Sequence, residues 1–90
     1  MKALKFGAVW CPACLIMKSR WEEIEAKLPW LKTQHFDFDK DKKAIEKYQL
    51  NSGKLPVFIF LDNQNKEILR LQGEIPQEKL EKTIKKLKDK

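Results

Sequence analysis

Cys11 and Cys14 are the residues whose type and spacing point most directly to chemistry. They are the only cysteines in the chain and stand in the stretch "VWCPACLIMK", residues 9–18. Two thiols separated by two residues can hold a metal ion, form a structural disulfide, or cycle between dithiol and disulfide. The remainder of the sequence decides among these uses.

The first two uses fit poorly. A zinc ion ordinarily takes four protein ligands, and beyond the cysteines the chain offers one histidine, His35. A zinc or iron–sulfur site would therefore need two chains, each giving a cysteine pair. A structural disulfide closing so short a loop would stabilise the fold little, and a reducing cytoplasm would open it. Thiol–disulfide exchange is the interpretation that we favour.

Length and composition indicate one domain, residues 1–90, with a single core. The chain has 90 residues, of which 42% are hydrophobic and 36% charged. No apolar run approaches the roughly 20 residues that a membrane-spanning helix needs. We interpret the N-terminus as mature protein and not as a signal peptide, because cysteines, a proline and Lys18 break its apolar stretch. We therefore expect a cytoplasmic protein without a membrane partner.

The net charge of +6 comes mainly from lysines on helical patterns that also carry glutamates. Such a pattern is typical of a solvated helix face, and no basic patch is interleaved with aromatic residues. We expect no nucleic-acid partner. We expect the protein to be a monomer.

The hydrophobic pattern predicts an α/β fold in the order β-α-β-α-β-β-α. A strand, a helix and then a strand at the start imply two parallel strands with a right-handed crossover, and a hairpin follows. The product is a four-stranded mixed sheet with helices on both faces. The predicted strands are 3–9, 33–39 ("TQHFDFD"), 57–61 ("VFIFL") and 67–72 ("EILRLQ"); the predicted helices are 12–28, 41–48 and one that Pro76 opens; "NSGK" and "DNQNK" are predicted turns.

This order places the cysteine pair where the first strand ends and the first helix begins. With Cys11 as N-cap, Pro12 occupies the first helical position, where proline costs nothing. The free backbone donors of the first turn and the helix dipole would both stabilise a thiolate on Cys11. Cys14 lies one turn further on the same face, within reach of a disulfide.

The sequence therefore supplies an attacking thiol and a resolving thiol. Cys11, expected to be accessible, would attack a partner disulfide and form a mixed disulfide. Cys14 would then displace the product and leave an intramolecular bridge. The pair itself is the redox centre, and we expect no cofactor and no metal.

At this point the chain resembles the thioredoxin family over nearly its whole length. The stretch "FGAVWCPAC" is similar to the active-site segment, "KLPVFIFLD" to the segment with the cis-proline and its strand, and "LQGEIPQEKL" to the glycine turn before the last helix. The resemblance implies a minimal thioredoxin fold. It also implies a protein-disulfide reductase of cell redox homeostasis and electron transport, with protein disulfides as substrates and a disulfide reductase as electron donor.

Residue by residue, the resemblance gives roles to further positions. Cys11 matches the family nucleophile, Cys14 the resolving thiol, and Pro56 the cis-proline that faces them. Leu55 would offer backbone groups to an extended substrate segment. The docking surface would be lined by Trp10, Pro12, Leu55 and Gly73, although Gly73 fits a plain turn glycine equally well.

The sequence also departs from the family pattern. The first strand and helix of full-length thioredoxins do not precede Cys11, and the pair encloses Pro-Ala instead of Gly-Pro. Proline after the first cysteine is more glutaredoxin-like, so a glutathione-dependent reductase stays an alternative. Against it, the glycine turn reads "QGE" and lacks the paired glycines and aspartate with which glutaredoxins bind glutathione.

Lys5 stands six residues before Cys11, where thioredoxins commonly hold a buried aspartate. We favour a side chain that extends to solvent along the sheet. The alternative is a lysine buried near Cys14. It would then be a candidate proton acceptor when neutral, or a pKa modulator of the thiol when charged.

Overall fold

The structure is a computed structural model that describes residues 1–50 and 54–90, and this part of the chain has the predicted order of elements. The predicted turn "NSGK" falls mostly outside the described residues. No helix within them is long and apolar enough to cross a membrane. The elements are β1 (Lys2–Gly7), α1 (Pro12–Lys27), β2 (Lys32–Asp37), α2 (Lys42–Lys47), β3 (Val57–Leu61), β4 (Glu67–Gln72) and α3 (Gln77–Lys86).

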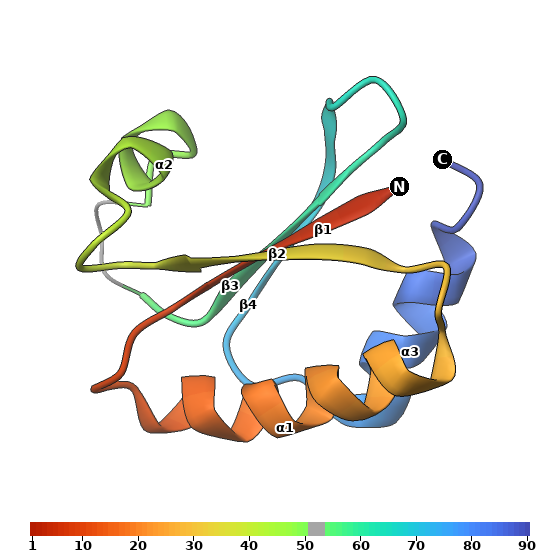
Figure 1. Ribbon diagram of the computed structural model, residues 1–90, viewed down its shortest axis with the longest axis horizontal. Coiled ribbons are helices and arrows are strands. Elements are labelled where there is room, and N and C mark those ends of the chain that lie inside the picture. The colour runs from red at the N-terminus through yellow and green to blue at the C-terminus, as the bar shows by residue number, and fades with distance from the viewer. Residues whose placement is uncertain (51–53) are drawn as a thin grey trace.

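The four strands form one mixed sheet in the order β2-β1-β3-β4. β1 runs parallel to β2 and antiparallel to β3, and β4 is antiparallel to β3. Helices α1 and α3 lie together on one side of the sheet, and α2 lies on the other (Figure 1). The predicted architecture, including the parallel crossover and the hairpin, is confirmed.

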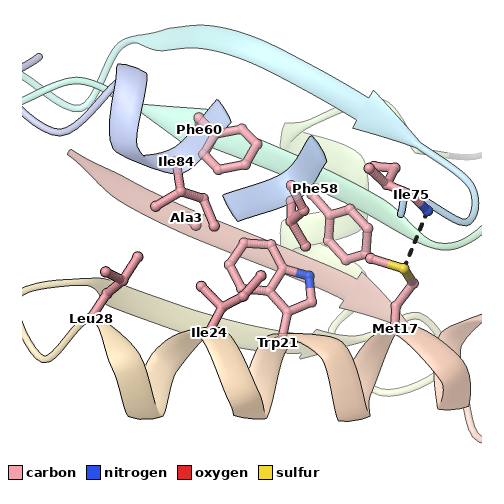
Figure 2. Packing of buried hydrophobic residues seen from close by; sticks show 10 residues of the cluster. Ala3, Met17, Trp21, Ile24, Leu28, Phe58, Phe60, Ile75 and Ile84 are labelled. Atoms are coloured by element: carbon pink, nitrogen blue, oxygen red, sulfur yellow. Dashed lines mark hydrogen bonds between the residues drawn. The ribbon is translucent and has the colours of Figure 1, made fainter. Parts of the chain in front are cut away.

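Alternation along the central strands divides the interior into two cores. Leu4 and Phe6 of β1 point toward α2, whereas Ala3 points toward α1 and α3. All of β3 is buried, as its continuous apolar sequence predicts. The α1-side core, shown in Figure 2, comprises Ala3, Met17, Trp21, Ile24, Leu28, Phe58, Phe60, Ile75, Leu80 and Ile84. The α2-side core comprises Leu4, Phe6, Ile45, Leu50, Val57, Ile59 and Leu61.

Helix α1 is tied to the segment that leads into α3. The Arg20 guanidinium donates to the Ile75 carbonyl oxygen at 2.8 Å and to Glu74 Oε1 at 3.1 Å. The buried Ile75 N–H in turn points at the Met17 sulfur, 3.3 Å away (Figure 2). These contacts hold α1, whose first turn carries the cysteine pair, against the segment that leads into α3.

Two predicted strands are longer than the observed ones at their carboxyl ends. β1 ends at Gly7, because the Cys11 N–H donates to the Ala8 carbonyl oxygen at 3.2 Å and closes a turn. β2 ends at Asp37, whose Oδ1 accepts from the N–H groups of Asp39 and Lys40 at 2.8 and 3.1 Å. In both places a local hydrogen bond replaces strand pairing.

Candidate active site

The cysteine pair lies at the turn between β1 and α1. Cys11 has extended backbone angles (φ −99°, ψ 109°) and is the N-cap of α1, with Pro12 at the first helical position. The Cys14 N–H donates to Cys11 Sγ at 3.2 Å. This confirms the predicted capping arrangement, in which an otherwise unpaired donor of the first turn points at the Cys11 sulfur.

The accessibility of the two thiols is the reverse of what the sequence predicts. Cys11 is only 6% exposed, whereas Cys14 is half-buried. The prediction that Cys11 is the accessible thiol is therefore wrong for this conformation. The cause is the cap itself, because the Cys11 side chain folds back over the first turn of the helix to reach the Cys14 N–H.

Cys14 is held as a neutral thiol. Burial raises the pKa of the Cys14 thiol to about 12, and the hydrogen bond and charge interaction with Cys11 act in the same direction. A backbone hydrogen bond with Ala8 opposes them only in part. Near neutral pH, Cys14 must therefore lose a proton before it can act as a nucleophile.

Pro56 and Gly73 lie next to each other on the side of the sheet that carries Cys14. The Gly73 N–H donates to the Pro56 carbonyl oxygen at 2.8 Å, and Pro56 borders the same cavity as Cys14. The Leu55–Pro56 peptide bond is cis. Gly73 has φ +86°, which favours glycine. The turn interpretation of Gly73 therefore has direct support, while Leu55 is half-buried at the start of the same segment.

Trp10 is exposed beside the cysteine turn but is fixed in place. Its indole Nε1 donates to Asp39 Oδ2 at 2.8 Å, and its ring meets Phe38 edge-on with centroids 6.2 Å apart. Pro12 is exposed next to it. Sequence reasoning named Trp10 and Pro12 but missed Asp39 and Phe38, which follow the carboxyl end of the neighbouring parallel strand.

An exposed apolar surface surrounds the pair. Large hydrophobic side chains with high exposure flank Cys11 and Cys14 in sequence, and they are Val9, Trp10, Leu15 and Ile16. Leu15 and Ile16 belong to helix α1. Both face solvent, because the buried stripe of the helix is formed by Met17, Trp21 and Ile24.

Lys5 extends along the sheet to an ion pair. Its ammonium donates to Glu25 Oε2 at 3.1 Å, and the Lys5 and Glu25 side chains are 18% and 31% exposed. The same ammonium lies 5.5 Å from the centre of the Trp21 ring. This arrangement lies between the two interpretations of the sequence, because the side chain is mostly buried and borders the same cavity as Cys14, while its ammonium is paired with Glu25. An ammonium has no lone pair with which to accept the Cys14 proton.

A cavity of about 310 Å³ lies against Cys14 on the α1 side of the sheet. Its lining includes Lys5, Gly7, His35 and Pro56. Sequence reasoning considered His35 only as a metal ligand and gave Gly7 no role. They come together through the register of β1 with β2, in which Lys5 pairs with His35 and Gly7 with Asp37, and local sequence does not display that register.

The described residues do not gather a metal site. Among residues 1–50 and 54–90, no three His, Cys, Asp or Glu side chains are grouped so as to hold a metal ion.

Comparison with known proteins identifies the family. The family model described as thioredoxin matches residues 2–86. The chain belongs to the thioredoxin family. The matched range contains both cysteines, the cis-proline and the glycine turn, so all the motifs on which the resemblance rested lie within this thioredoxin domain.

A curated relative supports the assignment. The chain is 34% identical over 70 residues to thioredoxin H5 of Oryza sativa subsp. japonica. The aligned region covers 78% of this chain and 50% of that protein. The chain thus spans half the length of this curated relative.

Solved structures share the thioredoxin fold. The chain is 25% identical to a thioredoxin-2 described as a component of malaria parasite protein secretion machinery, with a TM-score of 0.84 over 93% of this chain and 80% of that one. It is 27% identical to Fasciola hepatica thioredoxin, with a TM-score of 0.83 over 94% of this chain and 78% of that one.

Proposed function

We propose that this protein reduces disulfides in other proteins, with Cys11 as the attacking thiol and Cys14 as the resolving thiol. The observation that carries the proposal is the position of Cys11 as the N-cap of α1, with the Cys14 N–H 3.2 Å from its sulfur. A thiolate that forms at this position is stabilised by a backbone donor and by the positive end of the helix dipole. Membership of the thioredoxin family supports thiol–disulfide exchange as the type of reaction.

The mechanism has two steps. The Cys11 thiolate attacks one sulfur of the substrate disulfide, forms a mixed disulfide and releases the first substrate thiolate. Cys14, after losing its proton, attacks Cys11 Sγ, releases the second substrate thiolate and leaves a Cys11–Cys14 disulfide. A disulfide reductase then returns the pair to the dithiol. No cofactor besides the two thiols enters either step.

The substrate surface belongs to the same proposal. We propose a docking surface that is made of Trp10, Pro12, Leu55, Pro56 and Gly73. Within it, the hydrogen bond to Asp39 fixes the indole of Trp10, and a hydrogen bond joins Gly73 to Pro56. A rigid exposed aromatic ring provides apolar contact area at little entropic cost. We place the protein in the cytoplasm as a monomer, where a reducing environment keeps the pair reduced.

Trapping of mixed disulfides tests the roles of the two thiols. The Cys14→Ser variant should accumulate mixed disulfides with protein substrates through Cys11, because attack proceeds and resolution cannot. The Cys11→Ser variant and the double variant should accumulate none above background. Mass spectrometry of non-reduced complexes gives the linked residues. Accumulation through Cys14 in the Cys11→Ser variant would reverse the assignment, which the greater exposure of Cys14 makes a real alternative.

Two further measurements separate the other functions. The reduction potential of the Cys11–Cys14 couple should lie near the value of about −270 mV typical of reducing thioredoxins, and a value near −120 mV would indicate an oxidant. Turnover should depend on a thioredoxin-reductase system; turnover with glutathione alone would favour the glutaredoxin-like alternative. Stoichiometric zinc or iron in protein purified under reducing conditions would favour the metal-binding alternative.

A further inference from the structure

Resolution by Cys14 requires an acceptor for its proton. The thiol is half-buried, and burial raises its pKa to about 12, so very little thiolate exists at neutral pH. A positioned base that takes the proton during attack removes this obstacle. The following inference rests on the proposed function, because it concerns the second step of that reaction.

The backbone of Gly7 leaves open space between Cys14 and His35. A Cβ atom at Gly7 would lie 3.4 Å from both Cβ and Sγ of Cys14 and 3.8 Å from Cε1 of His35. The thiol and the imidazole therefore face each other across the place where a Gly7 side chain would begin. All three residues border the same cavity of about 310 Å³. One bridging water spans about 5–6 Å between two polar atoms, which suits a gap of this kind.

The cavity has a mainly apolar lining into which a few polar side chains are set. The indole Nε1 of Trp21 is buried and has no hydrogen-bond partner among the described residues. Figure 2 shows this nitrogen on the side of the ring that faces Phe58 and Met17, both of which border the cavity. Buried donors are ordinarily satisfied by protein or by ordered water. This nitrogen has almost no surface accessible to water, so a water between Cys14 and His35 does not depend on it.

The other titratable groups around the cavity are poorer acceptors. Lys5 on β1, the register partner of His35, is an ammonium that donates to Glu25. Asp37 on β2 already uses one carboxylate oxygen to accept two backbone N–H groups. Lys18 and Glu22 of α1 also border the cavity, and both are exposed to solvent, as His35 itself is. A cation cannot accept a proton, and an ordinary carboxylate is a weak base toward a thiol.

We propose that His35 is the general base for the resolving step and takes the Cys14 proton through one water in the gap above Gly7. An imidazole ordinarily titrates near neutrality, so it can accept and return a proton under physiological conditions. The Cys14 S–H proton passes to the imidazole, and the sulfur electron pair forms the bond to Cys11 Sγ. The bond between Cys11 and the substrate sulfur breaks. The departing substrate thiolate then takes up a proton from the imidazolium or from solvent.

Single-turnover kinetics tests this role. The substrate is a peptide disulfide whose second-released thiol, the one held in the mixed disulfide, becomes fluorescent when it leaves. Acid quenching and mass spectrometry follow the mixed disulfide, and fluorescence follows release of the second thiol. His35→Gln should slow resolution about tenfold at pH 7 and leave attack by Cys11 unchanged. Gly7→Ala should do the same, because the added methyl fills the gap at ordinary contact distances. The double variant should be no slower than the slower single variant, since both interrupt one path.

The pH profile excludes a merely structural role. In the parent protein, resolution should slow as the pH falls and the imidazole becomes protonated, whereas His35→Gln should lose this inflection. Asp37→Asn is the matched control on the same strand and cavity and should resolve at the parent rate. Parent-like resolution in His35→Gln, or slow resolution only in Asp37→Asn, would overturn the role of His35 while leaving the proposed function intact. Absence of Cys11 attack in the parent protein would instead refute the proposed function.

Discussion

On the α2 side of the sheet, Leu4 and Phe6 of β1 are buried among apolar side chains, whereas on the other side Lys5 and Gly7 of the same strand border a cavity. The buried residues of the α2-side core are all apolar, and Phe6 stacks on Phe36 with ring centroids 5.0 Å apart. We call this side of the sheet the closed face and the side that borders the cavity the open face. The α1-side core is equally apolar over most of its area. Toward the cysteine pair, however, polar and ionisable side chains, among them Lys5, His35 and Asp37, border the cavity.

This contrast shows how a small sheet separates stability from chemistry. Successive residues of a strand point to opposite faces, so one strand can serve both purposes without conflict. The reactive end of α1 requires space around Cys14 for a changing bond and a leaving proton. Gly7 provides this space, and the apolar residues on the opposite face, together with the rest of the α1-side core, hold the strand in position.

The largest effect is expected from removing side-chain volume on the closed face. Ile59 is fully buried in the α2-side core, and Ile59→Ala should lower the free energy of unfolding by about 2–5 kcal/mol. Gly7→Ala adds one methyl on the open face, where the nearest atoms are at 3.4 Å, and should change it by less than about 1 kcal/mol. Urea denaturation of reduced protein measures both values. A comparable loss in the two variants would mean that the faces do not differ in this way.

Much of the fold, and part of the candidate site, was predictable from local sequence. The run "VFIFL" predicts the buried β3 at its observed bounds, and "EILRLQ" predicts β4. The capping role of Cys11 follows from its place before a proline at a helix start. These features depend on hydrophobic period and on backbone chemistry within a few residues, which a single sequence displays directly.

The remaining features depend on how distant segments meet. The burial of Cys11 depends on how its side chain folds over the helix, which the spacing of the cysteines does not specify. The approach of His35 to Cys14 depends on the register between β1 and β2, which brings residues about thirty positions apart into pairs. The hydrogen bond from Trp10 to Asp39 likewise joins two loops at the carboxyl ends of parallel strands.

An intermediate effect is expected from the thiol on the open face as the pH rises. Because the Cys14 pKa is raised on folding, the folded protein keeps this proton to higher pH than the unfolded chain does. The resulting stabilisation is complete below the ordinary cysteine pKa of about 8.5 and is lost as the pH rises toward 12. The reduced parent should therefore lose more stability between pH 8 and about 10.5 than Cys14→Ser does.

Chemical denaturation at several pH values measures this difference, and the variant controls for the lysines that both proteins titrate alike. Oxidised parent, in which neither cysteine has a proton to lose, should likewise lose less stability over this pH range than reduced parent. Parallel curves for reduced parent and variant would show that burial of Cys14 does not favour its neutral form.

The smallest effect is expected from the ion pair at the edge of the open face. Lys5 and Glu25 are both partly exposed, and such pairs contribute little net stability, so Lys5→Met should change the free energy of unfolding by less than about 1 kcal/mol. Since the ammonium already donates to Glu25, we expect attack and resolution within about twofold of the parent. Lys2→Met is the matched control for net charge, because Lys2 lies on the same strand as Lys5 and donates to Gln34 of β2. If Lys5→Met, but not Lys2→Met, slowed the resolving step about tenfold, equivalent to about 1.4 kcal/mol, Lys5 and not His35 would be the proton acceptor.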